Sequence, residues 1–185
     1  MISRIRKTVL GILVLASVAA VASNGGWRRF CSTAGFSVMY PQTWVRIGAS
    51  ADRLQVLSSS GGAKGVIIKQ GQAEITVMEV KGSSTDTLAQ VVEKYTQGTS
   101  VLERRDVHSE TSNDRCTNLR EVISKEPSVP PKDTPIQVPY TINTDLFCEI
   151  GKQRVVVLLR NWEGDERQAE YQQIALRMAE SIKLR

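Results

Sequence analysis

The sequence predicts an α+β fold in which a largely antiparallel sheet is covered by helices. Short segments rich in valine and isoleucine, separated by glycine and serine clusters, predict a β-meander in the first half. Residues 84–98 and 165–183 carry the apolar spacing of amphipathic helices. Strands that are interrupted by one helix and closed by another are typical of this layered arrangement.

The first 22 residues have the pattern of a secretory signal peptide. Arg4, Arg6 and Lys7 precede an apolar run over residues 9–22, which ends in small residues. The run is about 14 residues long, shorter than the roughly 20 that a membrane-spanning helix needs. We therefore expect export to the periplasm or the extracellular space. The alternative is an uncleaved leader that tethers the protein to the membrane.

The remainder of the chain is of a size that forms one domain. Residues 23–34 are small, basic or aromatic without regular spacing, so we expect a flexible lead-in there, followed by a single domain over residues 35–185. The formal net charge of +5 falls to about +2 without the three cations of the leader. Basic residues are scattered among acidic ones, and aromatic residues make up only 5% of the chain. The composition therefore predicts no nucleic-acid binding.

The first predicted strand covers residues 36–40, where apolar and polar residues alternate. A turn over residues 42–44 follows and should place Trp44 in the core. β-branched residues between glycine and serine clusters predict further strands at 45–47, 54–57, 65–69 and 74–80.

The first helix is predicted to begin at Ser84 or Thr85 and to end at Gly98. Its apolar residues fall on one stripe, which must lie on a sheet face: Leu88, Val91, Val92 and Tyr95. After this helix, strand character returns at 101–107, 117–124, 145–150 and 154–159. Gly151 and Lys152 separate the last two strands and predict a two-residue hairpin.

The closing helix, predicted over residues 165–183, has the strongest periodicity of the chain. Asp165 and Gln168 are spaced as a capping box. Lys183 and Arg185 lie at the end where the helix dipole favours cations. The apolar stripe contains Tyr171, Ile174, Ala175, Met178, Ala179 and Ile182.

The segment from Gly35 to Trp44 resembles the opening strand of the PsbP-like superfamily, in which an aromatic-led strand runs into Tyr-Pro and then a tryptophan. The end of the chain is similar too, with Asn161-Trp162 followed by a helix that closes on residues 179–183. The superfamily includes the photosystem II extrinsic protein, Ran-binding Mog proteins and many exported bacterial proteins. The resemblance implies an α-β-α sandwich and a binding or assembly module rather than an enzyme.

Three cysteines leave one unpaired after a single disulfide. We predict a bridge between Cys116 and Cys148, because both lie in strand-like segments and the bridge would close a loop of about 33 residues. Pairing of Cys31 with either of the others is the alternative. A free Cys31 would be a small buried hydrophobic residue or a reactive thiol.

A proline-rich loop is predicted over residues 125–139, which hold five of the six prolines. Proline removes a backbone donor and favours an extended chain, so this segment should leave the sheet between two strands. If a loop contacts a partner, we expect it to be this one, through Pro127, Pro130, Pro131 and Pro135.

Three weaker motifs have simpler explanations than chemistry. His108 is the only histidine and lies near charged residues without a metal-binding or triad pattern, so we expect a surface side chain. The glycines of residues 61–65 lack the lysine and helix of a phosphate-binding loop and predict a hairpin tip. Glu163, Asp165 and Glu166 lack calcium-loop spacing and are typical of a helix start. We therefore predict no catalytic residue, metal or cofactor site.

The leading functional hypothesis is an exported, non-catalytic binding or assembly module whose partner is a protein or a cell-envelope component. The first alternative is a small-ligand carrier or an enzyme with a site between sheet and helices, using groups such as Tyr40, Arg46 or Glu79. A polar pocket of roughly 300 Å³ or more would favour that alternative. The second alternative is a membrane-tethered structural domain of the envelope.

Overall fold

In the computed structural model, residues 26–58, 71–83, 85–107, 116, 118–127 and 140–185 are described. Seven antiparallel strands form a large sheet in the order β3 (Val45–Arg46), β4 (Leu54–Leu57), β5 (Glu74–Glu79), β9 (Gln153–Trp162), β8 (Tyr140–Ile150), β7 (Asn118–Pro127) and β6 (Ser100–Val107). A small sheet has the order β1 (Trp27–Cys31), β2 (Phe36–Pro41) and β10 (Lys183–Leu184). The predicted leader, residues 1–22, lies outside the described residues.

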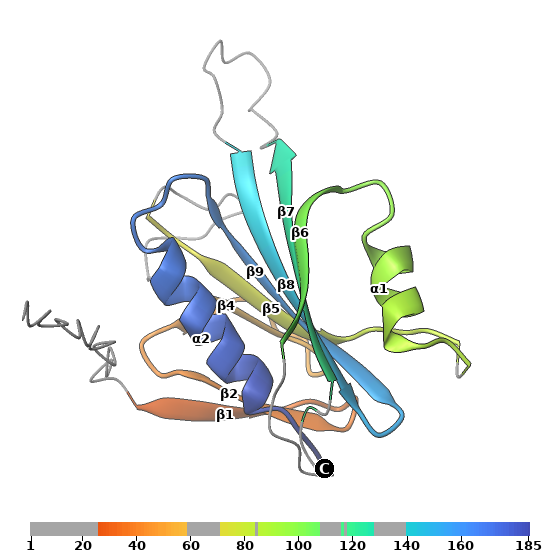
Figure 1. The fold of residues 1–185 in the computed structure, drawn as a ribbon. Coiled ribbons are helices and arrows are strands. Elements are labelled where there is room, and N and C mark those ends of the chain that lie inside the picture. Colours follow the sequence, from red (N-terminus) through yellow and green to blue (C-terminus); the bar gives the residue numbers. More distant parts are fainter. Residues whose placement is uncertain (1–25, 59–70, 84, 108–115, 117, 128–139) are drawn as a thin grey trace, which may run out of the picture.

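The two helices lie on opposite sides of the large sheet (Figure 1). Helix α2 (Gln168–Glu180) and the small sheet cover one face, and helix α1 (Leu88–Tyr95) lies against the other. The structure therefore confirms the predicted α-β-α arrangement with an antiparallel central sheet. It also confirms the two-residue hairpin, because Ile150 and Gln153 are paired across it.

The core is divided between the two faces by the alternation of side chains along each strand. On β8, Leu146 and Cys148 enter the larger cluster under α2, whereas Phe147 enters the smaller cluster under α1. Trp44 is buried in the larger cluster, as predicted, with its ring centroid 6.0 Å from that of Tyr171. The α1 cluster is small, so much of this face depends on polar contacts.

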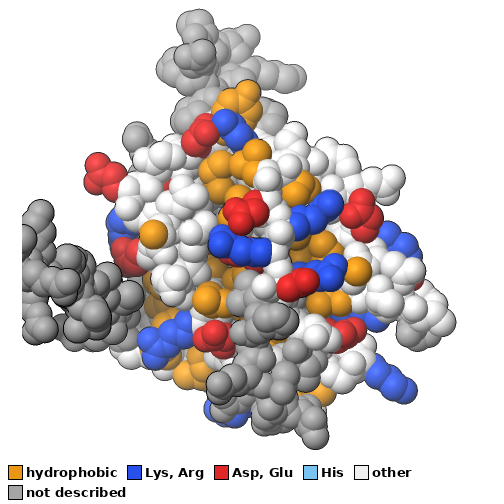
Figure 2. Space-filling model, in the orientation of Figure 1, with side chains coloured by type: hydrophobic (Ala, Val, Ile, Leu, Met, Phe, Trp, Pro, Cys, Tyr) orange, Lys and Arg blue, Asp and Glu red, His pale blue; other side chains and the backbone are white. Residues whose placement is uncertain are grey.

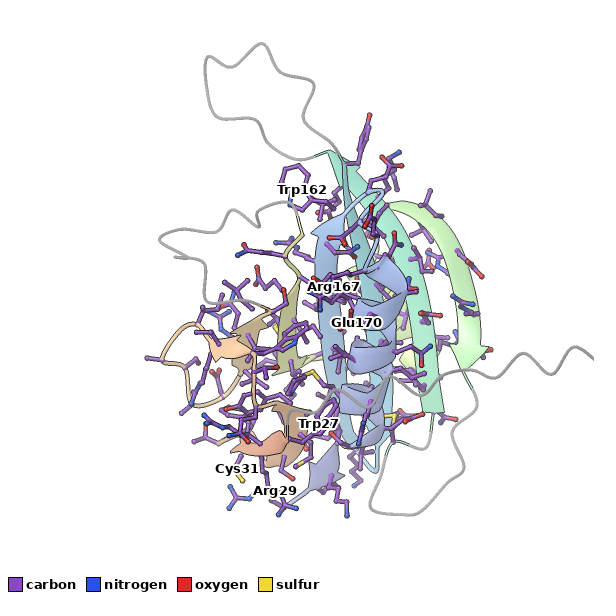
Figure 3. All side chains as sticks on the ribbon, turned by 90° about the vertical axis from the view of Figure 1, so that its left-hand side faces the viewer. Trp27, Arg29, Cys31, Trp162, Arg167 and Glu170 are labelled. Atoms are coloured by element: carbon purple, nitrogen blue, oxygen red, sulfur yellow. A yellow bond between two sulfur atoms is a disulfide. The ribbon has the colours of Figure 1, made fainter. Side chains whose placement is uncertain are left out.

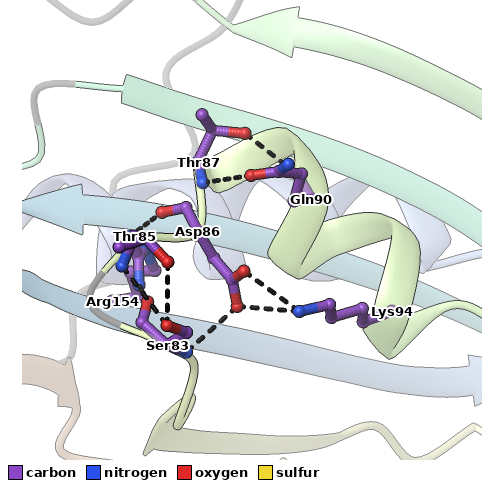
Figure 4. A network of polar contacts seen from close by, with 7 residues as sticks. All are labelled: Ser83, Thr85, Asp86, Thr87, Gln90, Lys94 and Arg154. Carbon is purple, nitrogen blue, oxygen red and sulfur yellow. Dashed lines mark hydrogen bonds and ion pairs between the residues drawn. The ribbon is translucent and has the colours of Figure 1, made fainter.

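Helix α1 begins later than predicted, with Thr87 rather than Ser84 or Thr85 as its N-cap. The Thr87 side chain accepts a hydrogen bond from the Gln90 backbone, and the Gln90 side chain accepts one from the Thr87 backbone (Figure 4). This capping box satisfies two backbone donors that Thr85 could not reach from its place in the preceding turn.

Polar contacts attach the start of α1 to the sheet (Figure 4). Arg154 on β9 donates to the backbone oxygens of Ser83 and Asp86. The Asp86 carboxylate accepts from Lys94 Nζ at 2.9 Å and from the Ser83 backbone, and these contacts hold the pKa of Asp86 below its usual value. The segment before α1 is thus joined both to the helix and to β9.

Helix α2 is shorter than predicted at both ends, and the predicted capping box of Asp165 and Gln168 is wrong. Arg167 occupies the N-cap position without a side-chain cap, while the Asp165 side chain accepts from the Arg167 backbone nitrogen at 2.9 Å. At the other end, Lys183 pairs with Ser37 of β2, so the chain leaves the helix to become β10.

The flexible lead-in predicted over residues 23–34 contains a strand, β1. The prediction failed because this edge strand does not show the alternation of polar and apolar residues that is typical of a strand. Arg28 and Arg29 are both exposed, and only Phe30 is buried. Strands β7, β8 and β9 are longer than predicted by two residues or more, and β2 and β6 by one residue each. The strand predicted at residues 65–69 lies outside the described residues.

Charges of both signs are mixed on the face seen in Figure 2, with hydrophobic side chains between them. The ion pairs of the described residues include Arg105 with Glu121 on neighbouring strands and Arg167 with Glu170 at the start of α2. Such exposed pairs contribute little to stability, and they leave this face without one dominant sign.

Candidate functional site

The candidate site lies on the α1 side of the large sheet, where β7, β8 and β9 extend beyond the helix (Figure 1). The antiparallel register places side chains of the three strands in rows across the sheet. One row consists of Ser124, Asn143 and Arg160, and the adjacent rows add Glu126 and Asp145. We call these five residues the distal polar face.

The distal polar face was missed in the sequence because β8 was predicted to begin only at residue 145. The observed strand begins at Tyr140, and Asn143 and Asp145 are two residues apart on the same face. Ile142, Thr144 and Leu146 alternate with them toward the α2 side, where Leu146 joins the larger cluster and Thr144 accepts from Gln172. Because Thr144 is polar, the segment has three consecutive polar residues, and the sequence shows no alternating signal for this part of the strand.

Asp145 is the most unusual titratable group of the face. It is only 9% exposed, and the described residues donate no hydrogen bond to its carboxylate. Burial raises the pKa of Asp145 to about 7; the neighbouring Glu126 raises it further, and Arg160 acts in the opposite direction. Near neutral pH this carboxyl group therefore exists in both protonation states.

Two more polar side chains of this face are almost fully buried. Ser124 is 2% exposed and Asn143 is 6% exposed. The Oδ1 atom of Asn143 has no hydrogen-bond partner among the described residues. A buried acceptor without a donor lowers the stability of the fold by about 1–3 kcal/mol. A ligand that donates a hydrogen bond to Asn143 Oδ1 would therefore bind favourably here.

Carboxyl groups outnumber cations around Arg160. One of its guanidinium nitrogens lies 3.8 Å from a Glu126 oxygen, and Arg160 also faces the buried Glu74 across the β5–β9 ladder. Glu74 accepts hydrogen bonds from Gln55 and from Thr76. Glu126 and Asp145 thus place two carboxyl groups near one guanidinium, and Glu74 occupies the paired position on β5.

The α2 side of the same strand ends presents an aromatic and charged surface. Tyr140 is 44% exposed, and Lys125 Nζ lies 4.1 Å from the centre of its ring and 2.7 Å from a Glu163 oxygen. The half-buried Trp162 lies at the same end of the molecule, far from Trp27 and Cys31 in Figure 3. It is on the α1 side, however, because it alternates along β9 with Leu158, which packs against the smaller cluster. Exposed aromatic residues beside charges are enriched in protein interfaces.

The proline-rich loop begins later than predicted. Residues 125–127 continue β7, and Pro127 pairs with Tyr140 as the last pair of the β7–β8 ladder. A proline is tolerated here because the end of a ladder does not require its missing backbone donor. Pro130, Pro131 and Pro135 lie outside the described residues, so their contact with a partner stays a prediction.

The predicted disulfide between Cys116 and Cys148 is present. Their Cα atoms are 5.4 Å apart, and the bridge ties the segment before β7 to β8 within the larger core cluster. Cys31 is a free, exposed thiol on β1, so the expectation of a buried Cys31 is wrong. It is exposed because β1 is an edge strand.

A second polar site is a cavity of about 310 Å³ beside the end of β5. Glu79, one of the residues considered for a ligand site, lines it, and Gln153 Nε2 lies 3.3 Å from a Glu79 oxygen. Arg46 supports a neighbouring loop by donating to the Ser50 backbone, whereas Tyr40 packs against the larger core cluster. The lining also includes Ala34, Ser50, Asp52, Arg53, Met78 and Lys81.

The weaker sequence motifs give no site in the described residues. His108 and residues 61–65 lie outside them. Glu163 pairs with Lys125, and Asp165 accepts a hydrogen bond from the start of α2, as acids at a helix start do.

Within the described ranges, no group of three histidine, cysteine, aspartate or glutamate side chains is placed to hold a metal ion. In that part of the chain, no helix has the length and apolar character needed to cross a membrane.

Comparison with known proteins identifies the fold but no close relative. No family model matches the chain, and no curated protein matches it. The Ran-binding protein Mog1p from Saccharomyces cerevisiae aligns with 86% of this chain and 96% of its own, at a TM-score of 0.53 and 11% identity. The chain has the Mog1p fold. The predicted PsbP-like fold, of which Mog proteins are examples, is thereby confirmed.

Two further solved structures have lower scores. The cyanobacterial PsbP of Synechocystis sp. PCC 6803 has a TM-score of 0.45 at 15% identity and covers 92% of this chain and 99% of its own. A protein of Bacteroides thetaiotaomicron has a TM-score of 0.47 at 14% identity over 87% of this chain. The chain spans only 48% of the length of the Bacteroides protein.

Proposed function

We propose that this protein is an exported, non-catalytic binding or assembly module whose partner is a protein or a cell-envelope component. The carrying observation is the surface at the ends of β7 and β8, where the exposed Tyr140 lies with the charged side chains of Lys125 and Glu163. The fold likeness to a protein described as Ran-binding is compatible with such a role. The proline-rich segment between β7 and β8 would enlarge this surface.

The register of β7 and β8 allows a clean test of the segment. Replacing residues 128–139 by Asn-Gly joins the paired residues Pro127 and Tyr140 through a two-residue hairpin turn, so both strands keep their pairing. The tagged full chain and this variant are used to capture partners from envelope extract. We expect the variant to lose a component that the full chain recovers.

Point variants distinguish specific binding at the aromatic surface from non-specific hydrophobic binding. Tyr140→Ser should weaken capture of the same component about tenfold or more, as for a residue at an interface centre. Leu102→Ser is the matched control, because Leu102 is also exposed, at 59%, but lies on β6 at the sheet edge. Equal recovery by the full chain, the hairpin variant and Tyr140→Ser would refute the proposed surface.

Export is tested separately by the mass of the mature protein in its host. Removal of the leader would give a product that begins near Ser23, in the periplasm or outside the cell. A full-length product in the membrane fraction would instead support the membrane-tethered alternative. A full-length product in the cytosol would refute export.

The cavity beside β5 supports a small-ligand carrier as a second candidate function. Its volume of about 310 Å³ reaches the lower range of ligand sites, and its lining carries charges of both signs. Native mass spectrometry of protein purified from its host should then show a bound small molecule that Glu79→Gln loses. A ligand-free spectrum for the unmodified protein would refute this candidate.

A further inference from the structure

We infer that the distal polar face binds an organic cation, an ammonium or a guanidinium group, at Asp145 and Asn143. The site consists of side chains of the sheet and includes none of residues 128–139. A bound cation would give a donor to the buried Asn143 oxygen, which has none among the described residues.

The distal polar face has more hydrogen-bond acceptors than donors available to them. Asn143 Oδ1 is buried without a partner, and the carboxylate of Asp145 receives no hydrogen bond from the described residues. Two positions along one strand separate these residues, so their side chains lie on the same face within reach of one ligand. An ammonium carries three donors and a guanidinium five, and neither accepts a hydrogen bond. Such a group would supply donors to both acceptors.

The charges of the face favour the same ligand. Asp145 interacts with the charges of both Glu126 and Arg160, so the site carries one more negative than positive charge when both carboxyl groups are ionised. Without a ligand, proton uptake by Asp145 relieves this excess. A bound cation would relieve it in place of the proton, and the ionised carboxylate would then be stabilised.

An aromatic side chain borders the site. Tyr95 from α1 packs edge-on against Phe147 with ring centres 5.2 Å apart. Burial raises the pKa of Tyr95, and the charge of Asp145 raises it further. Its half-buried ring can contact an organic cation beside Asp145. Glu126 and Arg160, both partly exposed, form the outer border of the face.

A metal ion fits the same residues less well. Calcium requires six to eight oxygen ligands at roughly 2.3–2.6 Å. The described residues include no cluster of three carboxylate, histidine or cysteine side chains that could hold a metal ion. Asn143 and Asp145 supply fewer oxygen ligands than calcium requires, whereas an ammonium or guanidinium group needs only acceptors for its N–H donors.

The test measures the pKa of Asp145 by carbon NMR of the full chain in n-butylammonium chloride and in sodium chloride of equal ionic strength. We expect the pKa to fall by about one unit or more with butylammonium, since an opposite charge in contact has an effect of this size. The neutral analogue 1-butanol should leave the pKa unchanged. Glu163→Gln, on the other side of the sheet end, should respond as the unmodified protein does, whereas Asn143→Ala should respond less.

A second pair of probes identifies the source of the cation. Acetyl-Ala-Lys-Ala-amide is compared with the same peptide containing norleucine in place of lysine. A larger effect of the lysine peptide than of butylammonium points to a side chain of a protein partner, and an equal or smaller effect points to a free amine. An Asp145 pKa that is the same in butylammonium and sodium chloride, or that responds only to calcium chloride, would overturn the inference. The measurement needs no partner protein, so its failure is distinct from failure of the proposed binding function.

Discussion

Asp145 shows how one residue can make stability depend on pH. A carboxyl group whose pKa is raised in the folded state binds its proton more tightly there than in the unfolded chain. Its protonation therefore stabilises the fold at low pH, and this contribution is lost as the pH rises through about 4 to 7. Arg160 opposes the effect but does not cancel it.

We predict that Asp145→Asn removes most of this pH dependence. In the unmodified protein, the free energy of unfolding should fall by roughly 3 kcal/mol between pH 4 and pH 8 on account of Asp145, since each unit of pKa difference corresponds to about 1.4 kcal/mol. Urea denaturation at both pH values measures the difference. Glu163→Gln serves as the control and should keep the unmodified profile. The same slope in Asp145→Asn would contradict the assigned role.

The attachment of helix α1 to the sheet depends on its N-terminal cap as well as on a few buried apolar side chains. Only Leu88, Val91 and Val92 of this helix are buried, so the first turn relies on the capping box and on Arg154. A short helix of this kind is only marginally stable without tertiary contacts.

We therefore predict that Thr87→Ala destabilises the protein by about 1 kcal/mol, the usual loss for a threonine N-cap. Thr85→Ala is the matched control and should change the free energy of unfolding by no more than about 0.5 kcal/mol. Denaturant titration gives these values, and hydrogen exchange of the α1 amides locates the change. If both variants behave alike, the assigned helix start is wrong.

Local sequence patterns predicted which helices and strands exist better than they predicted where these elements end, and they did not predict the candidate site. The strand Leu54–Leu57 was predicted with its observed bounds because its apolar residues and the turn residues beside it indicate the same ends. The start of β8 was missed because Asn143 and Thr144 are polar although buried. The pairing of β5 with β9, which sets Glu74 opposite Arg160, joins segments far apart in the chain and leaves no local signal.

At the scale of the whole molecule, a disulfide reinforces a sheet whose neighbours are mostly sequential hairpins. Cys116 and Cys148 are 32 residues apart and connect the start of the β7–β8 ribbon to the larger core. A bridge that closes a loop of this size restricts the unfolded chain and stabilises the folded one.

Replacement of both cysteines by serine should lower the free energy of unfolding by about 3–4 kcal/mol. Cys31→Ser is the control and should change it by no more than about 0.5 kcal/mol, because Cys31 is exposed and unpaired. Guanidinium denaturation under non-reducing conditions measures both effects. A double variant as stable as the control would show that the bridge contributes nothing.

The pairing of β10 with β2 has a consequence for biosynthesis. Strand β2 lies between β1 and β10, and its β10 neighbours Lys183 and Leu184 come after every strand of the large sheet in the chain. The ribosome therefore makes all strands of the large sheet before the small sheet can close. During synthesis, β1 and β2 can form no more than a two-stranded ribbon, which is marginally stable on its own.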